Sequence, residues 1–361
     1  MKVDLFDYEL PEHLIAQRPL EKRDECRLLV LDPKEGAIAH KLFSDLPSLL
    51  SPGDLLILND TKVLRARIPA RKKGSGGHVE LLLLEGEGKR FKALARGRRI
   101  REGTELEIGD GSVDVRVLGR DREGNWVLEA SSTYEEIMKG FGKVPLPPYI
   151  KSQDIPEEGY QTVYAKREGS IAAPTAGLHF TEDLLERIKG MGVGIGFITL
   201  HVGPATFKLV RSERVEDHSM EYEWFEVPEE TAELIRKAKE EGKRTIAVGT
   251  TVVRALESRA SSDGTVIPGC GRTNMFIYPG YRFKVVDGMI TNFHLPRSTP
   301  LILVCAFAGR DMILRAYEEA IEKGYRFYSF GDAMFITGRA EGYGVLDNGE
   351  EGKGEVWDHQ G

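Results

Sequence analysis

Val63-Leu64-Arg65-Ala66-Arg67-Ile68-Pro69-Ala70 is the first of six short segments that follow one another between residues 63 and 129. Apolar and polar residues alternate in most of these segments, which is the pattern of half-buried strands, and Gly-rich turns separate them. The other five segments cover residues 78–85, 90–95, 104–108, 113–118 and 126–129. Six such segments in a row predict a small antiparallel β-barrel.

Sequence of a different kind flanks the barrel on both sides. Short apolar runs typical of buried strands cover residues 28–31 and 55–58. After the barrel, helices are predicted at residues 181–189, 229–241, 252–259 and 301–324, and strands at residues 196–201, 245–248, 275–278, 290–294 and 327–337. The Pro-rich run Val144-Pro145-Leu146-Pro147-Pro148-Tyr149 suits neither a helix nor a central strand and indicates a return linker.

These patterns predict an α/β fold in which one domain is inserted into another. Residues 1–61 and 151–337 would form a layered α/β body with a mostly buried sheet, and residues 62–150 the inserted barrel. Residues 338–361 are rich in glycine and acidic residues, so we expect a disordered or loosely attached tail.

Composition narrows the class of protein. The chain has 361 residues, 41% of them hydrophobic and 30% charged, which is typical of a soluble protein with two domains. Its longest apolar stretch, Leu301 to Ala308, is far shorter than the ~20 residues that span a bilayer. The acidic N-terminal stretch does not resemble a signal peptide. We therefore expect a cytoplasmic protein that makes no membrane contact.

Cysteine and histidine spacing argues against disulfides and metals. The three cysteines are far apart, and no two of the eight histidines have the His-x-x-x-His spacing of a helical metal site. The expected chemistry is metal-free.

Charge is distributed very unevenly along the chain. The formal net charge is −7, yet the segment from Lys62 to Arg101 contains 13 lysine and arginine residues and only three glutamates. This excess predicts a nucleic-acid-binding surface on the barrel, although an ordinary solvated face is the alternative. The candidate contacts are Arg65, Arg67, Arg96, Arg98 and Arg99. Arg65 and Arg67 would share one face if residues 63–70 form a strand.

Two glycine-containing segments are candidates for binding a small ligand. Gly192-Val193-Gly194-Ile195-Gly196 has the glycine spacing of a nucleotide-binding loop, but it follows a predicted helix and leads into a strand, the reverse of the required order. Gly249-Thr250-Thr251 has the right context, because a strand precedes it and a helix follows. It could bind a carboxylate or a ribose, or it could be a plain helix cap.

Four other segments place polar residues near predicted strand ends or helix starts. Residues 172–181 contain Thr175, Gly177 and His179, and residues 291–296 contain Asn292 and His294. The other two are residues 199–203 and residues 330–334, which contain Asp332. Open α/β sheets bind ligands at such positions, so together these segments predict a site, although any single histidine is more often structural.

Taken together, these segments resemble the S-adenosylmethionine:tRNA ribosyltransferase-isomerases of queuosine biosynthesis. The resemblance extends in order over residues 1–337. The matching runs are residues 14–17 with Pro19, residues 53–56, 59–61 and 160–165, Ala173-Pro174-Thr175-Ala176-Gly177-Leu178-His179-Phe180, Ala247-Val248-Gly249-Thr250-Thr251, Thr291-Asn292-Phe293-His294-Leu295-Pro296 and Phe330-Gly331-Asp332-Ala333-Met334.

The resemblance implies an architecture and a reaction. It implies a barrel inserted in an α/β body, and transfer of the ribosyl group of S-adenosylmethionine to 7-aminomethyl-7-deazaguanine at the tRNA wobble position. Epoxyqueuosine forms, and adenine and methionine are released. S-adenosylmethionine is consumed as a co-substrate, so no cofactor is expected. The partners would be S-adenosylmethionine and tRNA, with a monomer favoured.

Such a reaction needs a base to take a proton from C5′ of the donor and an acid to assist the departure of adenine. His179, His294 and Asp332 are the candidates for these roles. The residues expected to bind S-adenosylmethionine are Thr175, Gly177, Gly249, Thr250, Thr251 and Asn292, and the barrel arginines are expected to bind tRNA. Two alternatives are an S-adenosylmethionine-dependent RNA methyltransferase and a non-catalytic RNA-binding protein.

The chain departs from the family pattern at two positions. Glu221 stands where the family usually has histidine, and Ala205 where it commonly has glycine. A histidine role at position 221 is therefore impossible in this chain.

Overall fold

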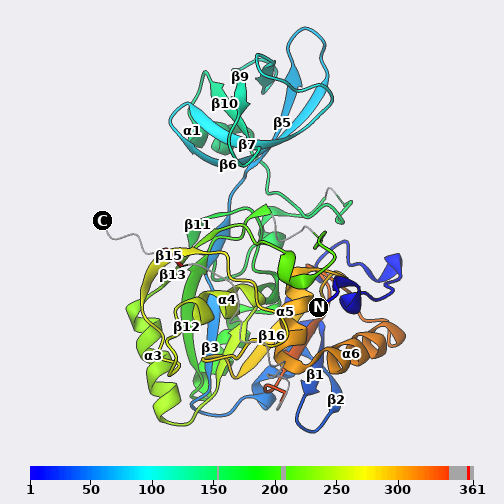
Figure 1. Ribbon diagram of the computed structural model, residues 1–361, viewed down its shortest axis with the longest axis vertical. Coiled ribbons are helices and arrows are strands. Elements are labelled where there is room, and N and C mark those ends of the chain that lie inside the picture. The colour runs from blue at the N-terminus through cyan, green and yellow to red at the C-terminus, as the bar shows by residue number, and fades with distance from the viewer. Residues whose placement is uncertain (153, 205–208, 341–355, 358–361) are drawn as a thin grey trace. The chain divides into compact units, whose positions relative to one another are not determined.

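The computed structural model of the chain describes residues 1–152, 154–204, 209–340 and 356–357. Two compact units are present (Figure 1): Met1–Lys62 with Pro147–Gly361, called the body below, and Val63–Leu146, called the barrel. Ala205 and most of the predicted tail, residues 341–355 and 358–361, lie outside the described residues. Within the described ranges, no helix is long and apolar enough to cross a membrane.

The predicted antiparallel barrel is confirmed. Its six strands close in the order β10-β7-β6-β5-β8-β9. They are β5 (Arg67–Lys72), β6 (His78–Glu87), β7 (Arg90–Arg96), β8 (Glu105–Ile108), β9 (Val113–Arg120) and β10 (Trp126–Ala130). Every second residue points inward, as Val113, Val115 and Val117 show by their burial. The sequence did not predict helix α1 (Tyr134–Phe141), which Thr133 caps.

The strand expected over residues 63–70 is misplaced. The chain forms β4 (Thr61–Val63), which pairs with β11 (Arg167–Ser170), and then leaves regular structure until β5 begins at Arg67. Arg65 therefore precedes the barrel strand. The alternation of burial nevertheless extends back to Ala66, which explains why the pattern looked continuous.

A ten-stranded mixed sheet forms the body, in the order β18-β15-β13-β12-β3-β14-β16-β17-β1-β2. At its centre, β12 (Gly194–Leu200), β3 (Leu55–Asn59), β14 (Thr245–Val248) and β16 (Gly288–Asn292) run parallel. Strand β17 (Ala333–Ile336) is antiparallel to β16 and parallel to β1 (Arg27–Asp32). The outer strands are β2 (Ala37–Leu42), β13 (Glu223–Val227), β15 (Gly269–Thr273) and β18 (Val356–Trp357).

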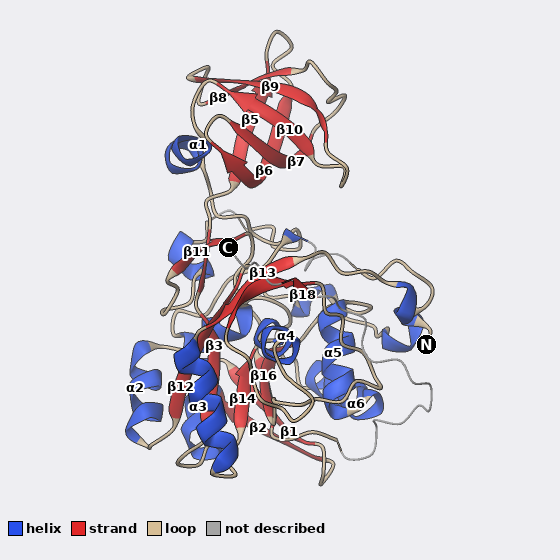
Figure 2. Ribbon diagram, turned by 60° about the vertical axis from the view of Figure 1, so that its left-hand side comes forward, coloured by secondary structure: helices blue, strands red, loops and turns tan. Residues whose placement is uncertain are grey.

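Helices cover both faces of this sheet, which confirms the layered α/β prediction (Figure 2). Leu55 and Ile57 of β3 join one apolar core, with helices α3 (Glu229–Glu240), α4 (Thr250–Ser258), α5 (Thr299–Ala308) and α6 (Arg310–Glu322). Leu56 and Leu58 join the other, with α2 (Glu182–Gly190). Successive residues of a strand face opposite sides, so this continuously apolar strand supplies both cores.

Several predicted elements differ from the structure. The helices expected between residues 301 and 324 are present as α5 and α6, which Gly309 separates because its φ of 86° ends α5. Residues 275–278 form no strand, and β15 comes earlier in the chain. Of residues 327–337 only β17 is a strand, because Tyr328 takes a left-handed φ of 70°. The Gly192–Gly196 run lies at the exit of α2 and the start of β12.

Candidate active site

A pocket lies in the body at the carboxyl ends of β14 and β16. Six of the nine residues predicted to bind the donor or to act as acid or base line it: Thr175, Gly249, Thr250, Thr251, Asn292 and His294. The pocket forms here because neighbouring parallel strands end at the same edge of the sheet. Gly177, His179 and Asp332 do not line it.

Two helices begin at this pocket, and their first turns supply its polar backbone. Gly249 is the N-cap of α4, with a φ of 95°. A Cβ at this position would make only ordinary contacts of 3.6 Å with Ala176 and Thr251, so the backbone conformation, rather than lack of space, calls for glycine. Ser298 caps α5 and also lines the pocket. Helix N-termini carry partial positive charge, so this end of the pocket favours an anionic group.

His179 lies behind the pocket wall and contacts the pocket through Asn292. Thr175 Oγ1 donates to Asn292 Oδ1 at 2.8 Å, and Asn292 Nδ2 donates to the Tyr328 carbonyl at 3.4 Å. These two bonds fix the amide orientation, so Nδ2 donates to His179 Nε2, 3.1 Å away. The imidazole proton is then on Nδ1, which faces Cys26 Sγ at 3.2 Å.

Burial determines the protonation state of this histidine. Desolvation lowers the pKa of His179 to about 3, and Arg326 and Arg23 add to the effect. The ring is therefore neutral at pH 7 and holds the Asn292 amide in place. It is a positioning residue in this geometry, since Asn292 separates it from the pocket.

His294 is the imidazole that lines the pocket. Its Nε2 lies 2.7 Å from Thr291 Oγ1, and its backbone N–H donates to Tyr317 Oη at 2.9 Å. The Tyr8 hydroxyl donates to its carbonyl oxygen. Desolvation lowers the pKa of His294 to about 3, so this ring is also neutral at pH 7.

Asp332 lies away from the pocket, at the start of β17. Its two carboxylate oxygens accept the backbone N–H groups of Arg27 at 3.0 Å and Arg326 at 2.8 Å. Both guanidinium groups lie within 3.6 Å of the carboxylate, which is only 2% exposed. These contacts tie the turn before β17 to the start of β1 and leave the carboxylate no access to a ligand.

Gly177 also has a packing role. A Cβ here would lie 2.0 Å from Tyr164 Oη, so only glycine allows the tyrosine to pack against this 3₁₀ turn, Thr175–His179. The turn is held in shape, and Thr175 projects toward Asn292.

Several pocket residues were not predicted. Tyr149 and Tyr328 form an aromatic wall with ring centroids 4.9 Å apart, and the Tyr149 hydroxyl lies 2.6 Å from Ser329 Oγ. Tyr149 ends the Pro-rich run, where an aromatic residue gives no signal of its own. Tyr328 has a positive φ, which is a strained backbone state for a tyrosine and cannot be predicted from a sequence pattern. Such strain is common at functional sites.

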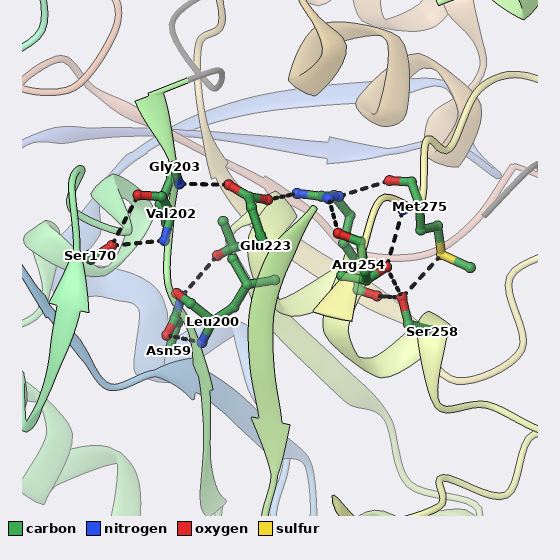
Figure 3. Close-up of polar contacts among 11 residues, drawn as sticks. Asn59, Ser170, Leu200, Val202, Gly203, Glu223, Arg254, Ser258 and Met275 are labelled. Atoms are coloured by element: carbon green, nitrogen blue, oxygen red, sulfur yellow. Dashed lines mark hydrogen bonds and ion pairs between the residues drawn. The ribbon is translucent and has the colours of Figure 1, made fainter. Parts of the chain in front are cut away.

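A buried polar network supports the pocket wall (Figure 3). Val202, which lines the pocket, donates its N–H to Ser170 Oγ at 2.8 Å, and the next residue, Gly203, donates to Glu223 Oε1 at 2.8 Å. Glu223 is ion-paired with Arg254 of α4, and the two residues are 5% and 6% exposed. The network therefore ties α4, which starts at the pocket, to β13 and to the wall.

The five candidate arginines of the barrel differ in their surroundings. Arg67 is half-buried; it donates to the Leu146 carbonyl at 2.8 Å and lies 3.8 Å from Glu80. Arg65, Arg96, Arg98 and Arg99 are exposed, and the last two lie in the turn after β7. Arg96, Arg98 and Arg99 are therefore better placed than Arg67 to meet an outside anion.

Within the described residues, no group of three or more His, Cys, Asp or Glu side chains could hold a metal ion.

Comparison with known proteins identifies the family of the chain. The family described as "Queuosine biosynthesis protein" matches residues 3–336. A solved structure of an S-adenosylmethionine tRNA ribosyltransferase from Thermotoga maritima is 39% identical, with a TM-score of 0.53. The match covers 92% of this chain and 99% of that one. The chain belongs to the queuosine biosynthesis protein family.

Proposed function

We propose that the protein transfers and isomerises the ribosyl group of S-adenosylmethionine onto 7-aminomethyl-7-deazaguanine at the wobble position of tRNA. The product is epoxyqueuosine, and adenine and methionine leave. The observation that carries the proposal is a match over 92% of the chain, at 39% identity, to a protein described as a tRNA ribosyltransferase. The strand-end pocket supports it, because six of the residues predicted to bind S-adenosylmethionine or to act as acid or base line this pocket.

The pocket suits a donor that carries its own charges. Of the described residues that line it, none has a charged side chain, so a sulfonium meets no repelling cation. The carboxylate of the methionine part would sit at the start of α4 or α5, where backbone N–H groups supply partial positive charge. Threonine hydroxyls and the Asn292 amide would bind the ribose.

We assign the base role to His294. It is the histidine among the described residues that line the pocket, and its neutral ring can accept the acidified C5′ proton of the donor. Burial, which lowers its pKa to about 3, makes it a weak base, so proton transfer depends on its position beside the donor. S-adenosylmethionine is a co-substrate in this scheme, and we propose no further cofactor. We propose the cytoplasm as its compartment, because its substrate would be tRNA.

Label transfer tests the function directly. S-adenosylmethionine labelled in the ribose or in the methyl group is incubated with tRNA that carries the precursor base. We expect ribose label alone on the RNA, and none on a control tRNA that has guanine at the wobble position. Methyl label on the RNA would indicate a methyltransferase, and tRNA binding without either label would indicate a binding protein.

A further inference from the structure

A second cleft lies at the opposite edge of the same sheet. Three strands run from the pocket to this cleft. Strand β14 begins at Thr245, which lines the cleft, and the residue that follows the strand, Gly249, lines the pocket. In the same way β16 connects Asn292 to Asp287. β17 runs the other way, so Ser329 before it lies at the pocket and Thr337 after it at the cleft.

Basic side chains dominate the lining of the cleft. Its cations are Lys34, Lys239, Lys243, Arg244, Lys284 and Arg339, and its single carboxylate is Asp287. Two of the six are neutralised, since Arg244 is ion-paired with Asp54 and Arg339 with Asp287. Lys239 lies in the last turn of α3, where a lysine complements the helix dipole, and it donates to the Asp263 carbonyl.

Neither an ion pair nor a position at the end of a helix accounts for Lys243 and Lys284. Neither ammonium has an ion-pair partner among the residues that the structure describes. The stem of Lys243 packs over Gly53, where a built Cβ would lie 2.8 Å from Lys243 Cε. The Lys284 carbonyl is likewise approached by Gly264, whose built Cβ would lie 2.6 Å from it. Close packing restricts the stem of Lys243 and the backbone of Lys284, so less entropy is lost when an anion binds.

We propose that this cleft binds backbone phosphates of the tRNA substrate, as a contact separate from the pocket. The inference rests on the proposed function. Strands of four or five residues at ~3.3 Å each separate the two edges by roughly 13 to 17 Å. The line between the two edges runs through the packed body, so an RNA that occupies both sites must follow the surface of the protein and needs more nucleotides than this distance alone would require. Lysines act as point charges, which suits sequence-independent phosphate contacts.

The test compares two variants of equal net charge. Lys243→Gln with Lys284→Gln removes two cleft lysines that have no ion-pair partner among the described residues. Lys22→Gln with Lys189→Gln removes two exposed lysines that are paired with Glu25 and Glu186, at 2.9 Å each. Affinity for tRNA with the precursor base is measured with the full-length protein over a salt series, alongside affinity for S-adenosylmethionine.

We expect the cleft variant to lose about 0.7 to 0.9 of salt slope per lysine and to bind tRNA at least ~tenfold more weakly at 50 mM salt. The control variant should keep the parental slope, and donor affinity should be unchanged in both. An unchanged slope in the cleft variant, or an equal loss in the control, overturns the inference. So does binding of inorganic phosphate at the cleft without any effect of the lysines on tRNA affinity. Failure of the proposed function is seen separately, as absence of ribose label on tRNA with the parent protein.

Discussion

The pocket and the basic cleft lie at the two ends of the same three strands, yet their chemistry is opposite. The described residues of the pocket carry no charged side chain, and its one imidazole is held neutral, whereas six cations line the cleft. The pocket obtains its polarity from helix starts and from side chains fixed by hydrogen bonds. The cleft obtains it from cationic side chains, of which Lys243 and Lys284 have no ion-pair partner among the described residues. The first arrangement suits orientation of a small ligand, and the second suits attraction of a large anion.

The largest expected effect tests how rigidly the pocket is held. Arg254→Met leaves Glu223 buried without its cation, which should lower the free energy of unfolding by about 3 to 5 kcal/mol. Urea unfolding measures the loss. The double variant Arg254→Met with Glu223→Leu contains no lone charge and should recover much of it. Lys243→Gln in the cleft should change stability by less than about 0.5 kcal/mol. Equal effects of the two single variants would contradict the contrast.

The second prediction concerns chemistry at the pocket. His294→Ala should lower turnover by about 100-fold or more, because it removes the imidazole that lines the pocket. Single-turnover kinetics with ribose-labelled donor measures this, and tRNA affinity serves as the control because it should not change. Asp332→Asn should affect stability before turnover. If Asp332→Asn slowed chemistry more than His294→Ala did in a folded protein, the assignment of His294 would be wrong.

A third prediction extends the contrast to the other basic region. Changing Arg96, Arg98 and Arg99 of the barrel together to Gln should flatten the salt dependence of tRNA binding, by roughly 0.7 to 0.9 for each phosphate that the variant no longer neutralises. Donor affinity, set by the pocket, should stay at the parental value. Arg67→Gln alone should have a smaller effect on the slope, since its guanidinium already donates to the Leu146 carbonyl. A parental slope in the triple variant would identify the barrel face as an ordinary solvated surface.

The fourth prediction follows from the neutral His179. Its folded pKa of about 3 lies below the unfolded value of ~6.5, so between these values the unfolded chain binds one more proton than the folded protein. Stability therefore falls as the pH drops below ~6.5, by up to about 1.4 kcal/mol per pH unit from this group. In His179→Gln the slope of unfolding free energy against pH should decrease by about one proton between pH 4 and pH 6. An unchanged slope would mean that His179 is protonated in the folded protein.

The sequence predicted those site residues that lie next to strands with a recognisable apolar pattern. Gly249, Asn292 and His294 lie beside strands with clear apolar patterns, and adjacent strand ends bring them together. The displacement of His179 and Asp332 from the pocket could not be foreseen, because periodicity does not say which side of a turn a side chain faces. Asp332 projects toward Arg27, about 300 residues earlier in the chain.

The basic cleft is even harder to predict from the sequence than the pocket. Lys243 and Lys284 belong to different connections, and only the neighbouring positions of β14 and β16 bring them to one edge. In the barrel, alternation predicted the strands well. The strand β5 begins later than predicted, because the alternation of burial extends back to Ala66 although strand pairing starts only at Arg67.

The place of β3 in the sheet has a consequence during synthesis on the ribosome. This strand has only buried residues, and its neighbours are β12 and β14. The chain from residue 60 to residue 193 must be made before the first of them exists, which takes on the order of ten seconds at cellular elongation rates. The barrel, by contrast, is complete at Leu146 and draws its strand pairs from its own residues. The nascent protein therefore passes through a stage in which a finished barrel follows an apolar strand without partners, the stage at which a chaperone would be needed most.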